Sequence, residues 1–177
     1  MHFQGIPFED TGFFSGLIEG YLDQREDLKP FYGRFPSLEG FKGQIADKER
    51  EFPQGHRLRV AEVLSQQYAD LNASDATLEH IEALKDSKTF TVVTGHQLNL
   101  FTGPLYFAYK ILCAVKLAAE LKEAYPECRF VPVYWMATED HDFEEINNFN
   151  FSGKNSHWNR EAEGGVGRMD LKGLEAV

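Results

Sequence analysis

Hydrophobic residues in the first half of the chain recur at helical spacing. In residues 10–27 they fall three and four positions apart, and residues 56–71 repeat this spacing. A loop rich in proline and glycine separates the two segments. Ser74 precedes a third helical pattern, residues 75–86, and its side chain is expected to cap that helix. Residues 1–88 therefore predict a helical region that packs on a core.

The second half of the chain reads as strand, helix and strand. Residues 89–95, TFTVVTG, are short and β-branched, which is typical of a buried strand. A long helix is predicted from Pro104, and Pro126 stops it. Residues 129–140 are then apolar on both faces up to Ala137, as in parallel sheets that helices cover on both sides.

This order predicts one βαβ unit and an α/β fold class. Residues 89–177 would form the start of a parallel-sheet core. One such unit supplies too few strands for a doubly wound sheet, so the sheet is expected to be incomplete in this chain.

Charge and composition argue against some classes of binding partner. The 177 residues carry a formal net charge of −10, from 18 Lys and Arg against 28 Asp and Glu. This balance argues against nucleic acid and anionic membranes as partners, because both attract clustered positive charge. The sequence has no apolar run of membrane-spanning length and no signal-peptide pattern at its start, so a cytoplasmic protein is expected. Cys113 and Cys128 fit neither a metal motif nor a disulfide framework.

Two polar loops follow the two predicted strands. GHQLNLFTG, residues 95–103, follows the first strand, and TEDHD, residues 138–142, follows the second. Ligands of open parallel sheets bind beyond the carboxyl ends of the strands. The two loops are therefore expected to meet in space and to form a ligand site.

The acidic loop supplies candidate catalytic residues. Adjacent carboxylates repel each other and are costly to desolvate, so Asp140, His141 and Asp142 favour a functional interpretation over a solvated acidic loop. Glu144 and Glu145 are instead interpreted as charges that stabilise the amino end of a helix.

The loop before the long helix predicts an anion site. Thr102 and Gly103 lie where a helix cap belongs, and the first turn after Pro104 has no acidic side chain. Backbone amides at such an end bind phosphate groups. The loop matches neither GxGxxG nor GxxxxGK[ST], so the signal is weak alone. Lys110 lies off the solvent face of the helix, where it could cover apolar surface or supply a cation to the anion.

His96 has several interpretations. It could hydrogen-bond a phosphate, bind a metal together with His141 and Asp142, or be a satisfied loop histidine. The sequence contains no HxH or HxxxH spacing, so the residues of any metal site stay unassigned.

At these residues the chain resembles a known family, the bacterial bacillithiol biosynthesis cysteine-adding enzymes. The two segments that carry the resemblance are VVTGHQLNLFTGPLYFAYK, residues 92–110, and VPVYWMATEDHDFEEIN, residues 131–147. Both segments are long, ungapped and in the right order. Many members of the family have glutamine in place of His96, which argues against an essential acid, base or metal ligand at that position.

The resemblance implies a ligase that joins cysteine to the amine of glucosaminyl-malate in the last step of bacillithiol synthesis. The implied fold is a Rossmann-like core similar to class I aminoacyl-tRNA synthetases, with a coiled coil that forms a homodimer. In that comparison GHQLNLFTGP takes the place of the histidine-containing signature of the synthetases. Chains of the family are about three times longer, so this chain is expected to span their N-terminal portion.

The implied chemistry requires a nucleotide, because a free carboxylate must be activated before it forms an amide. ATP or another nucleotide, together with magnesium, is the expected cofactor. The residues expected to bind it are Gly95, His96, Gln97, Asn99, Thr102, Gly103 and Lys110. Asp140, His141 and Asp142 would hold the substrate ammonium, carry magnesium or accept the proton of the attacking amine, without individual assignment.

Three other functions stay open on the sequence alone. A metal-dependent hydrolase or phosphotransferase would also place an acidic cluster at a strand end. A regulatory module would bind a nucleotide without amine-dependent turnover. A non-catalytic interaction domain would use the acidic loop as a solvated face.

Overall fold

The computed structural model describes residues 4–101 and 103–176. Contacts within the chain divide it into two units, Met1–Glu51 and Phe52–Val177. The sequence pattern instead predicts a boundary after residue 88, between the helical region and the strand–helix–strand core. The helices that immediately precede residue 88 share a unit with the sheet, because they pack against it.

The first unit is helical. Its elements are α1 (Phe8–Thr11), α2 (Gly16–Leu22), the 3-10 helix η1 (Glu26–Phe31) and α3 (Leu38–Glu51). The single helix expected over residues 10–27 is broken, because Gly12 adopts a left-handed φ of 66° and ends α1. The sequence did not predict α3. α3 has no buried residue, and its surface carries ion pairs such as Arg50–Asp47 at 2.8 Å.

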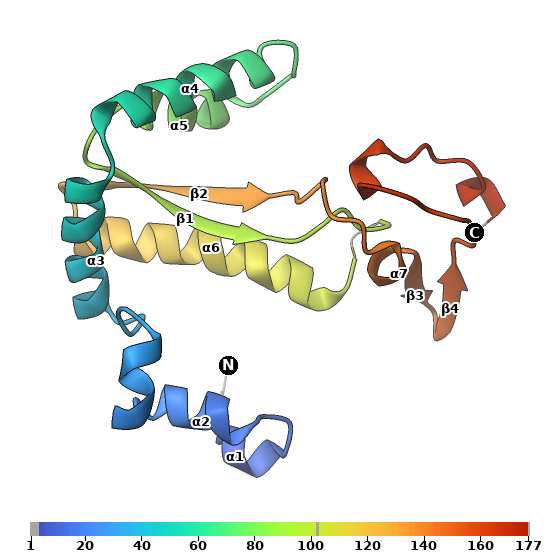
Figure 1. Ribbon diagram of the computed structural model, residues 1–177, viewed down its shortest axis with the longest axis horizontal. Helices are drawn as coiled ribbons and strands as arrows, with labels where there is room; N and C mark the ends of the chain where they lie inside the picture. Colours follow the sequence, from blue (N-terminus) through green and yellow to red (C-terminus); the bar gives the residue numbers. More distant parts are fainter. Residues whose placement is uncertain (1–3, 102, 177) are drawn as a thin grey trace. The chain divides into compact units, whose positions relative to one another are not determined.

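The second unit contains the sheet (Figure 1). Its elements are α4 (Gln54–Tyr68), α5 (Asp75–Ala83), β1 (Thr89–Gly95), α6 (Leu105–Ala124), β2 (Arg129–Trp135), α7 (Phe143–Ile146), β3 (Asn148–Phe151), β4 (Lys154–His157), η2 (Val166–Arg168) and η3 (Leu174–Ala176). β1 and β2 pair in parallel, from Thr89 opposite Arg129 to Gly95 opposite Trp135. The predicted βαβ unit and the α/β class are confirmed.

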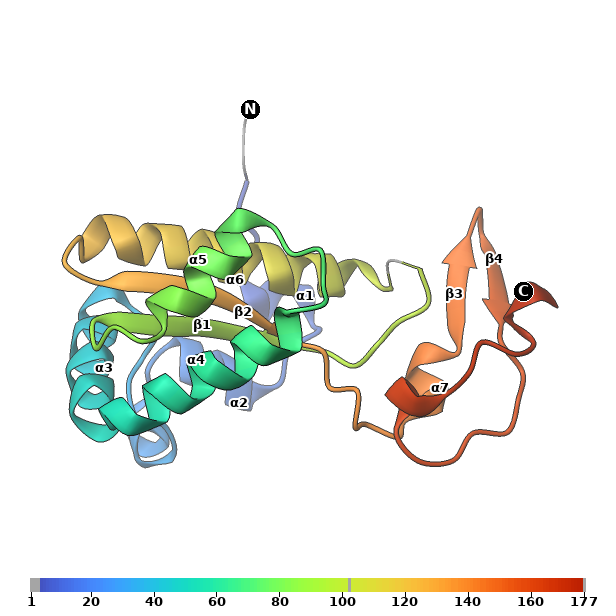
Figure 2. The same ribbon diagram turned by 90° about the horizontal axis from the view of Figure 1, so that it is seen from above.

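Helices cover both faces of the β1–β2 sheet. Figures 1 and 2 show α4 and α5 on one side of the strands and α6 on the other. On the first side, Ala61 of α4, Leu84 and Val131 of β2 form a buried cluster. On the second side, the Phe107 ring of α6 meets the Tyr134 ring of β2 at a centroid distance of 5.4 Å. The carboxyl ends of both strands emerge from this sandwich.

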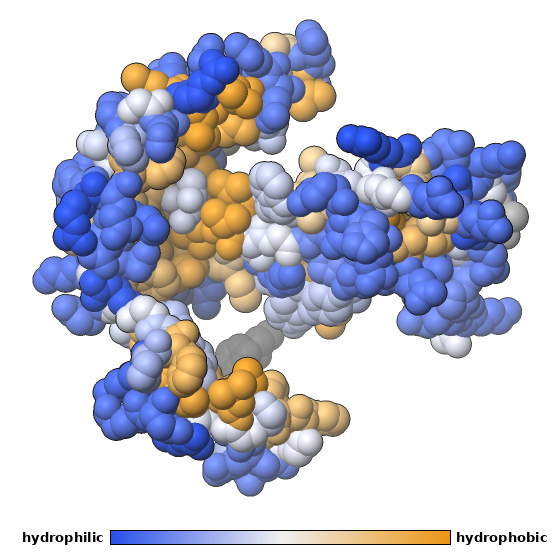
Figure 3. Space-filling view, viewed as in Figure 1, coloured by the Kyte–Doolittle hydropathy of each residue, from blue (hydrophilic) through white to orange (hydrophobic). Residues whose placement is uncertain are grey.

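Part of the hydrophobic surface of the second unit is exposed. Figure 3 shows it in orange over the sheet and along α4. Val93 of β1 is 59% exposed and Leu58 of α4 is 49% exposed. Among the described residues, no helix is both long enough and apolar enough to cross a membrane.

A second core joins the loop after β1 to the segment after β2. It consists of Phe143, Ile146, Trp158 and Val166, and Leu98 and Leu100 pack against it. The hairpin of β3 and β4 borders this core and was not predicted. Its turn residues Ser152 and Gly153 have φ values of 49° and 75°, as tight two-residue hairpins require. The second core therefore holds the two polar loops together.

The predicted cap of α5 is confirmed, and it yields a stability prediction. Ser74 Oγ accepts a hydrogen bond from Thr77 N at 3.3 Å. Replacing Ser74 with alanine should destabilise α5 by about 1 kcal/mol, because one first-turn amide loses its acceptor. Hydrogen exchange of peptides covering α5 measures this loss in the intact protein. Ser87→Ala, in an exposed turn, is the control, and an equal effect of the two substitutions would argue against the cap.

Candidate functional site

The strand ends hold the start of the loop after β1. His96 N donates to Trp135 O at 3.1 Å, and the Tyr134 hydroxyl donates to His96 O at 2.8 Å. Burial raises the pKa of Tyr134, so its hydroxyl remains a donor. A Cβ on Gly95 would lie 3.1 Å from Trp135 Cβ. Glycine at residue 95 therefore has a packing reason, in addition to the predicted role in binding a cofactor.

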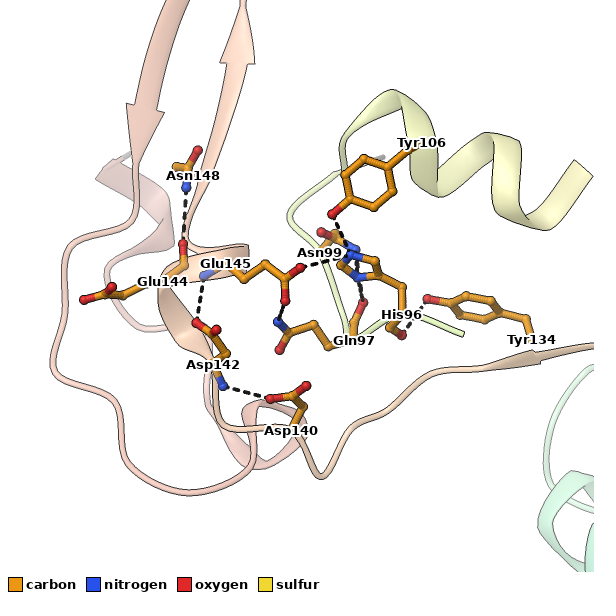
Figure 4. Close-up of polar contacts among 10 residues, drawn as sticks. All are labelled: His96, Gln97, Asn99, Tyr106, Tyr134, Asp140, Asp142, Glu144, Glu145 and Asn148. Atoms are coloured by element: carbon orange, nitrogen blue, oxygen red, sulfur yellow. Dashed lines mark hydrogen bonds and ion pairs between the residues drawn. The ribbon is translucent and has the colours of Figure 1, made fainter. Parts of the chain in front are cut away.

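The His96 ring lies at the centre of a polar network (Figure 4). Nε2 lies 2.8 Å from the Tyr106 hydroxyl, and Nδ1 lies 3.1 Å from Asn99 Nδ2 and 3.0 Å from Gln97 O. With its proton on Nε2, the ring accepts from Asn99. Protonation of Nδ1 would direct a second N–H to the Gln97 carbonyl. The His96 side chain is 6% exposed, so this network fixes its orientation.

Glu145 connects the two loops. Glu145 Oε2 accepts a hydrogen bond from Gln97 Nε2, and Oε1 lies 3.4 Å from His96 Nε2. Figure 4 shows Glu145 directed toward the loop after β1, whereas Glu144 points away from it. Burial, together with the Glu145 carboxylate, raises the pKa of the Tyr106 hydroxyl above its usual range. The loop after β1 thus meets the segment after β2, but the contact residue lies in α7, beyond residues 138–142, at a position that the sequence assigned to a helix end.

The three candidate catalytic residues lie beside this contact. Asp140 Oδ1 accepts from Asp142 N at 3.0 Å, and Asp142 Oδ1 accepts from Glu145 N at 3.1 Å, which caps α7. The His141 side chain is exposed, and no described residue forms a hydrogen bond with its imidazole. Each aspartate thus uses one oxygen on the backbone of its own loop. The catalytic roles of all three stay predictions.

The amino end of α6 faces the same loop. Pro104 is the N-cap, one position before the helix that it was expected to begin, and α6 starts at Leu105. No side chain caps this end, and its first turn contains no acidic residue. The first-turn amides and the positive end of a 20-residue helix fit an anion. Thr102, which was expected to take part, lies outside the described residues.

Lys110 lies on α6, one turn after Tyr106 and about 6 Å further along the axis. It is half-buried and forms no ion pair with any residue that the structure describes. The structure does not bring it into the His96 network. It remains a candidate cation for an anion bound near α6.

The residues of a resident metal site are not found in the described part of the chain. Within residues 4–101 and 103–176, His, Cys, Asp and Glu side chains form no group of three or more that could hold a metal. The interpretation of His96 as a metal ligand with His141 and Asp142 therefore gains no support. Magnesium usually binds through one or two carboxylates and substrate phosphates, and the strand-end carboxylates fit that mode.

A close contact at Gly103 yields a second prediction. Gly103 has a φ of 62°, and a Cβ there would lie 2.9 Å from Asn99 Cγ. Gly103→Ala should therefore destabilise the loop by about 1 kcal/mol more than Gly153→Ala, whose φ is 75° but whose surroundings are open. Hydrogen exchange of peptides covering residues 96–106 and 148–157 compares the two. Equal costs would show that Asn99 does not restrict residue 103.

Comparison with known proteins identifies the family. A family model described as "Bacillithiol biosynthesis BshC, N-terminal Rossmann-like domain" matches residues 1–177. Three relatives carry the name "Putative cysteine ligase BshC". The protein from Flavobacterium johnsoniae is 53% identical over 169 residues, that from Flavobacterium psychrophilum 51% over 170, and that from Christiangramia forsetii 49% over 176.

The alignments cover 96%, 96% and 97% of this chain, but 32%, 32% and 33% of the respective relatives. The chain thus spans about a third of the length of the curated relatives that it matches. The resemblance seen in residues 92–110 and 131–147 extends over almost the whole sequence. The chain therefore belongs to the BshC family and corresponds to its N-terminal Rossmann-like domain.

Proposed function

We propose that the intact protein is a ligase that joins cysteine to the amine of glucosaminyl-malate, the last step of bacillithiol synthesis. The observation that carries the proposal is the match of residues 1–177 to the BshC domain, with relatives named as cysteine ligases. Its site would be the strand-end loops, because ligands of open parallel sheets bind there.

The chemistry requires activation of the cysteine carboxylate. An ATP-type nucleotide would supply it, converting the carboxylate to an acyl phosphate or acyl adenylate with release of ADP or pyrophosphate. The amine nitrogen then bonds to the acyl carbon, and phosphate or AMP leaves with the former carboxylate oxygen. The amine also loses one proton, which an acceptor near the acyl carbon must take.

Residues of both loops would share this work. The first-turn amides of α6 fit the phosphates, with Lys110 as a nearby cation and with His96, Gln97 and Asn99 as polar neighbours. Asp140, His141 and Asp142 would carry magnesium, hold a substrate ammonium or accept the proton. Gly95 and Gly103 would shape the loop against the nucleotide, and Thr102 would donate a hydrogen bond to it.

Calorimetric titration of ATP with magnesium into the intact protein tests this proposal. The variant to compare is the double substitution Asp140→Asn, Asp142→Asn. Asparagine keeps the oxygens that accept from Asp142 N and Glu145 N, so the variant removes charge and preserves the cap. We expect saturable binding that the variant weakens, and nucleotide consumption once cysteine and glucosaminyl-malate are both present. An intact protein that binds no nucleotide would exclude activation by ATP.

The proposal includes a homodimer formed through a coiled coil in the longer protein. This part comes from the family resemblance. Light scattering on the intact protein tests it, with a mass of two chains expected and a monomer as the contrary result.

A further inference from the structure

The Glu145 carboxylate has an unusual position for a charged group near a proposed phosphate site. It comes from α7, reaches the loop after β1 and keeps 45% of its side chain exposed. Its neighbours are the Gln97 amide, the His96 ring and the Tyr106 hydroxyl. Within the part of the chain that the structure describes, no Lys or Arg side chain pairs with it. The carboxylate therefore has acceptor capacity left for a further donor.

Gln97 gives a second, independent sign of a ligand. Gln97 is buried, with 3% of the residue exposed. Its Nε2 donates a hydrogen bond to Glu145, whereas its Oε1 has no partner among the described residues. Exchanging the two carboxamide atoms would set an oxygen against a carboxylate, so the observed orientation is the favourable one. An unpaired buried acceptor is unfavourable, because it loses its hydrogen bonds to water without gaining others. Such a group beside a carboxylate suits a ligand that only donates hydrogen bonds.

The neighbouring aspartates contact backbone amides instead of side chains of the loop after β1. Asp140 accepts a hydrogen bond from the backbone amide of Asp142, and Asp142 accepts one from the backbone amide of Glu145 in α7. Asn99 and Tyr106, which contact the His96 ring, are uncharged polar groups. Of the carboxylates at the strand ends, Glu145 is thus the one whose oxygens meet side chains of the loop after β1.

We propose that Glu145 binds the primary ammonium group of an amine substrate, and that Gln97 is a positioning residue that holds the carboxylate in place. An ammonium has three donors and no acceptor, which matches a carboxylate beside an unpaired amide oxygen. The same carboxylate would repel a phosphate, so phosphate is expected to bind at the amino end of α6 instead. This inference rests on the proposed function, because cysteine and glucosaminyl-malate both carry a primary amine.

The test is calorimetric titration of the intact protein with two matched pairs of ligands. One pair is cysteine and 3-mercaptopropionate, which lacks the amine. The other pair is glucosaminyl-malate and its N-acetyl derivative, which lacks the charge. The wild type should bind one amine at least about tenfold more tightly than its uncharged analogue, as a charge-assisted contact predicts, and the pair that shows this preference identifies the substrate.

Variants then assign the preference to Glu145. Glu145→Gln should remove most of the preference for the amine and leave binding of the analogue unchanged. Gln97→Met should reduce the preference for the amine in part, because the Glu145 carboxylate loses the hydrogen bond from Gln97 that fixes its position. Glu144→Gln is the matched control, since this adjacent carboxylate points away from the loop, and it should keep the full preference.

Two outcomes would overturn the inference. One is a Glu145→Gln variant that keeps the wild-type preference for both amines. The other is a wild type that prefers neither amine over its analogue. Failure of the ligase proposal would look different, because amine binding that depends on Glu145 would persist without any nucleotide-dependent amide product.

Discussion

Replacing Arg57 with alanine is expected to lower the free energy of opening of β1 by about 2–4 kcal/mol. The side chain lies on α4 with the residue 5% exposed, and Nη1 donates to Asp86 O at 3.1 Å and to Thr89 O at 2.7 Å. Its guanidinium also lies 5.2 Å from the centroid of the Phe52 ring. Alanine would remove this packing and leave two carbonyl groups without their charged donor.

Hydrogen exchange of peptides covering residues 86–95 in the intact protein measures this loss. Arg59→Ala is the matched control on the same helix, because Arg59 is 71% exposed and pairs with an exposed Glu62. The control should cost below about 1 kcal/mol. Arg57→Lys should cause a loss between those of the two alanine variants, since lysine keeps the positive charge but lacks the planar guanidinium with its several donors. If Arg57→Ala costs no more than Arg59→Ala, the buried arginine does not hold β1.

Leu121→Ala is expected to destabilise the second unit by about 2–5 kcal/mol. Leu121 is 1% exposed, and it shares the buried face of α6 with Ala114 and Ala118. Both of these buried neighbours are alanines, so neither can fill the space left by the lost methyl groups.

The measurement is hydrogen exchange of peptides covering β1 and β2 in the intact protein. Leu112→Ala is the control on the same helix, because Leu112 is 62% exposed. Its effect should stay within about 0.5 kcal/mol. A similar effect of both substitutions would mean that α6 does not depend on Leu121 for its packing against the sheet.

The βαβ unit could be predicted from sequence because each of its boundaries has a local cause. The β-branched run before Gly95 matches β1, and Pro104 and Pro126 flank α6, which ends at Ala124. The second strand ends at Trp135, earlier than the expected end at residue 140. Hydropathy could not show that end, because Met136 and Ala137 are apolar and Ala137 leaves the strand conformation with a φ of 35°.

Two elements left too weak a signal in the sequence. α3 buries no residue and contains two glycines, so neither hydrophobic periodicity nor helix propensity marks it. The β3–β4 hairpin has strands of four residues, and its Ser152–Gly153 turn was the available clue. Buried Arg57 is a similar case, because its position in an amphipathic helix looks like any other polar position.

The edge of the sheet at which the segments after β1 and β2 meet could be predicted, but the residue that makes the contact could not. Loops after parallel strands must share one edge of the sheet, so the meeting of residues 95–103 with the segment after β2 follows from topology. Topology does not determine which of the two adjacent carboxylates, Glu144 or Glu145, contacts the loop after β1. This choice depends on the rotation of α7, which the burial of Phe143 and Ile146 in the second core sets. Periodicity cannot fix the rotation of a four-residue helix.

Detection of the amide product tests the proposed ligase activity of the intact protein. The intact protein is incubated with cysteine, glucosaminyl-malate, ATP and magnesium, and mass spectrometry follows the product and the nucleotide together. The account predicts that amide and spent nucleotide form in equal amounts, and that the double variant Asp140→Asn, Asp142→Asn forms much less of both. A folded intact protein that binds its substrates and forms no amide, or forms it without consuming nucleotide, would contradict the account.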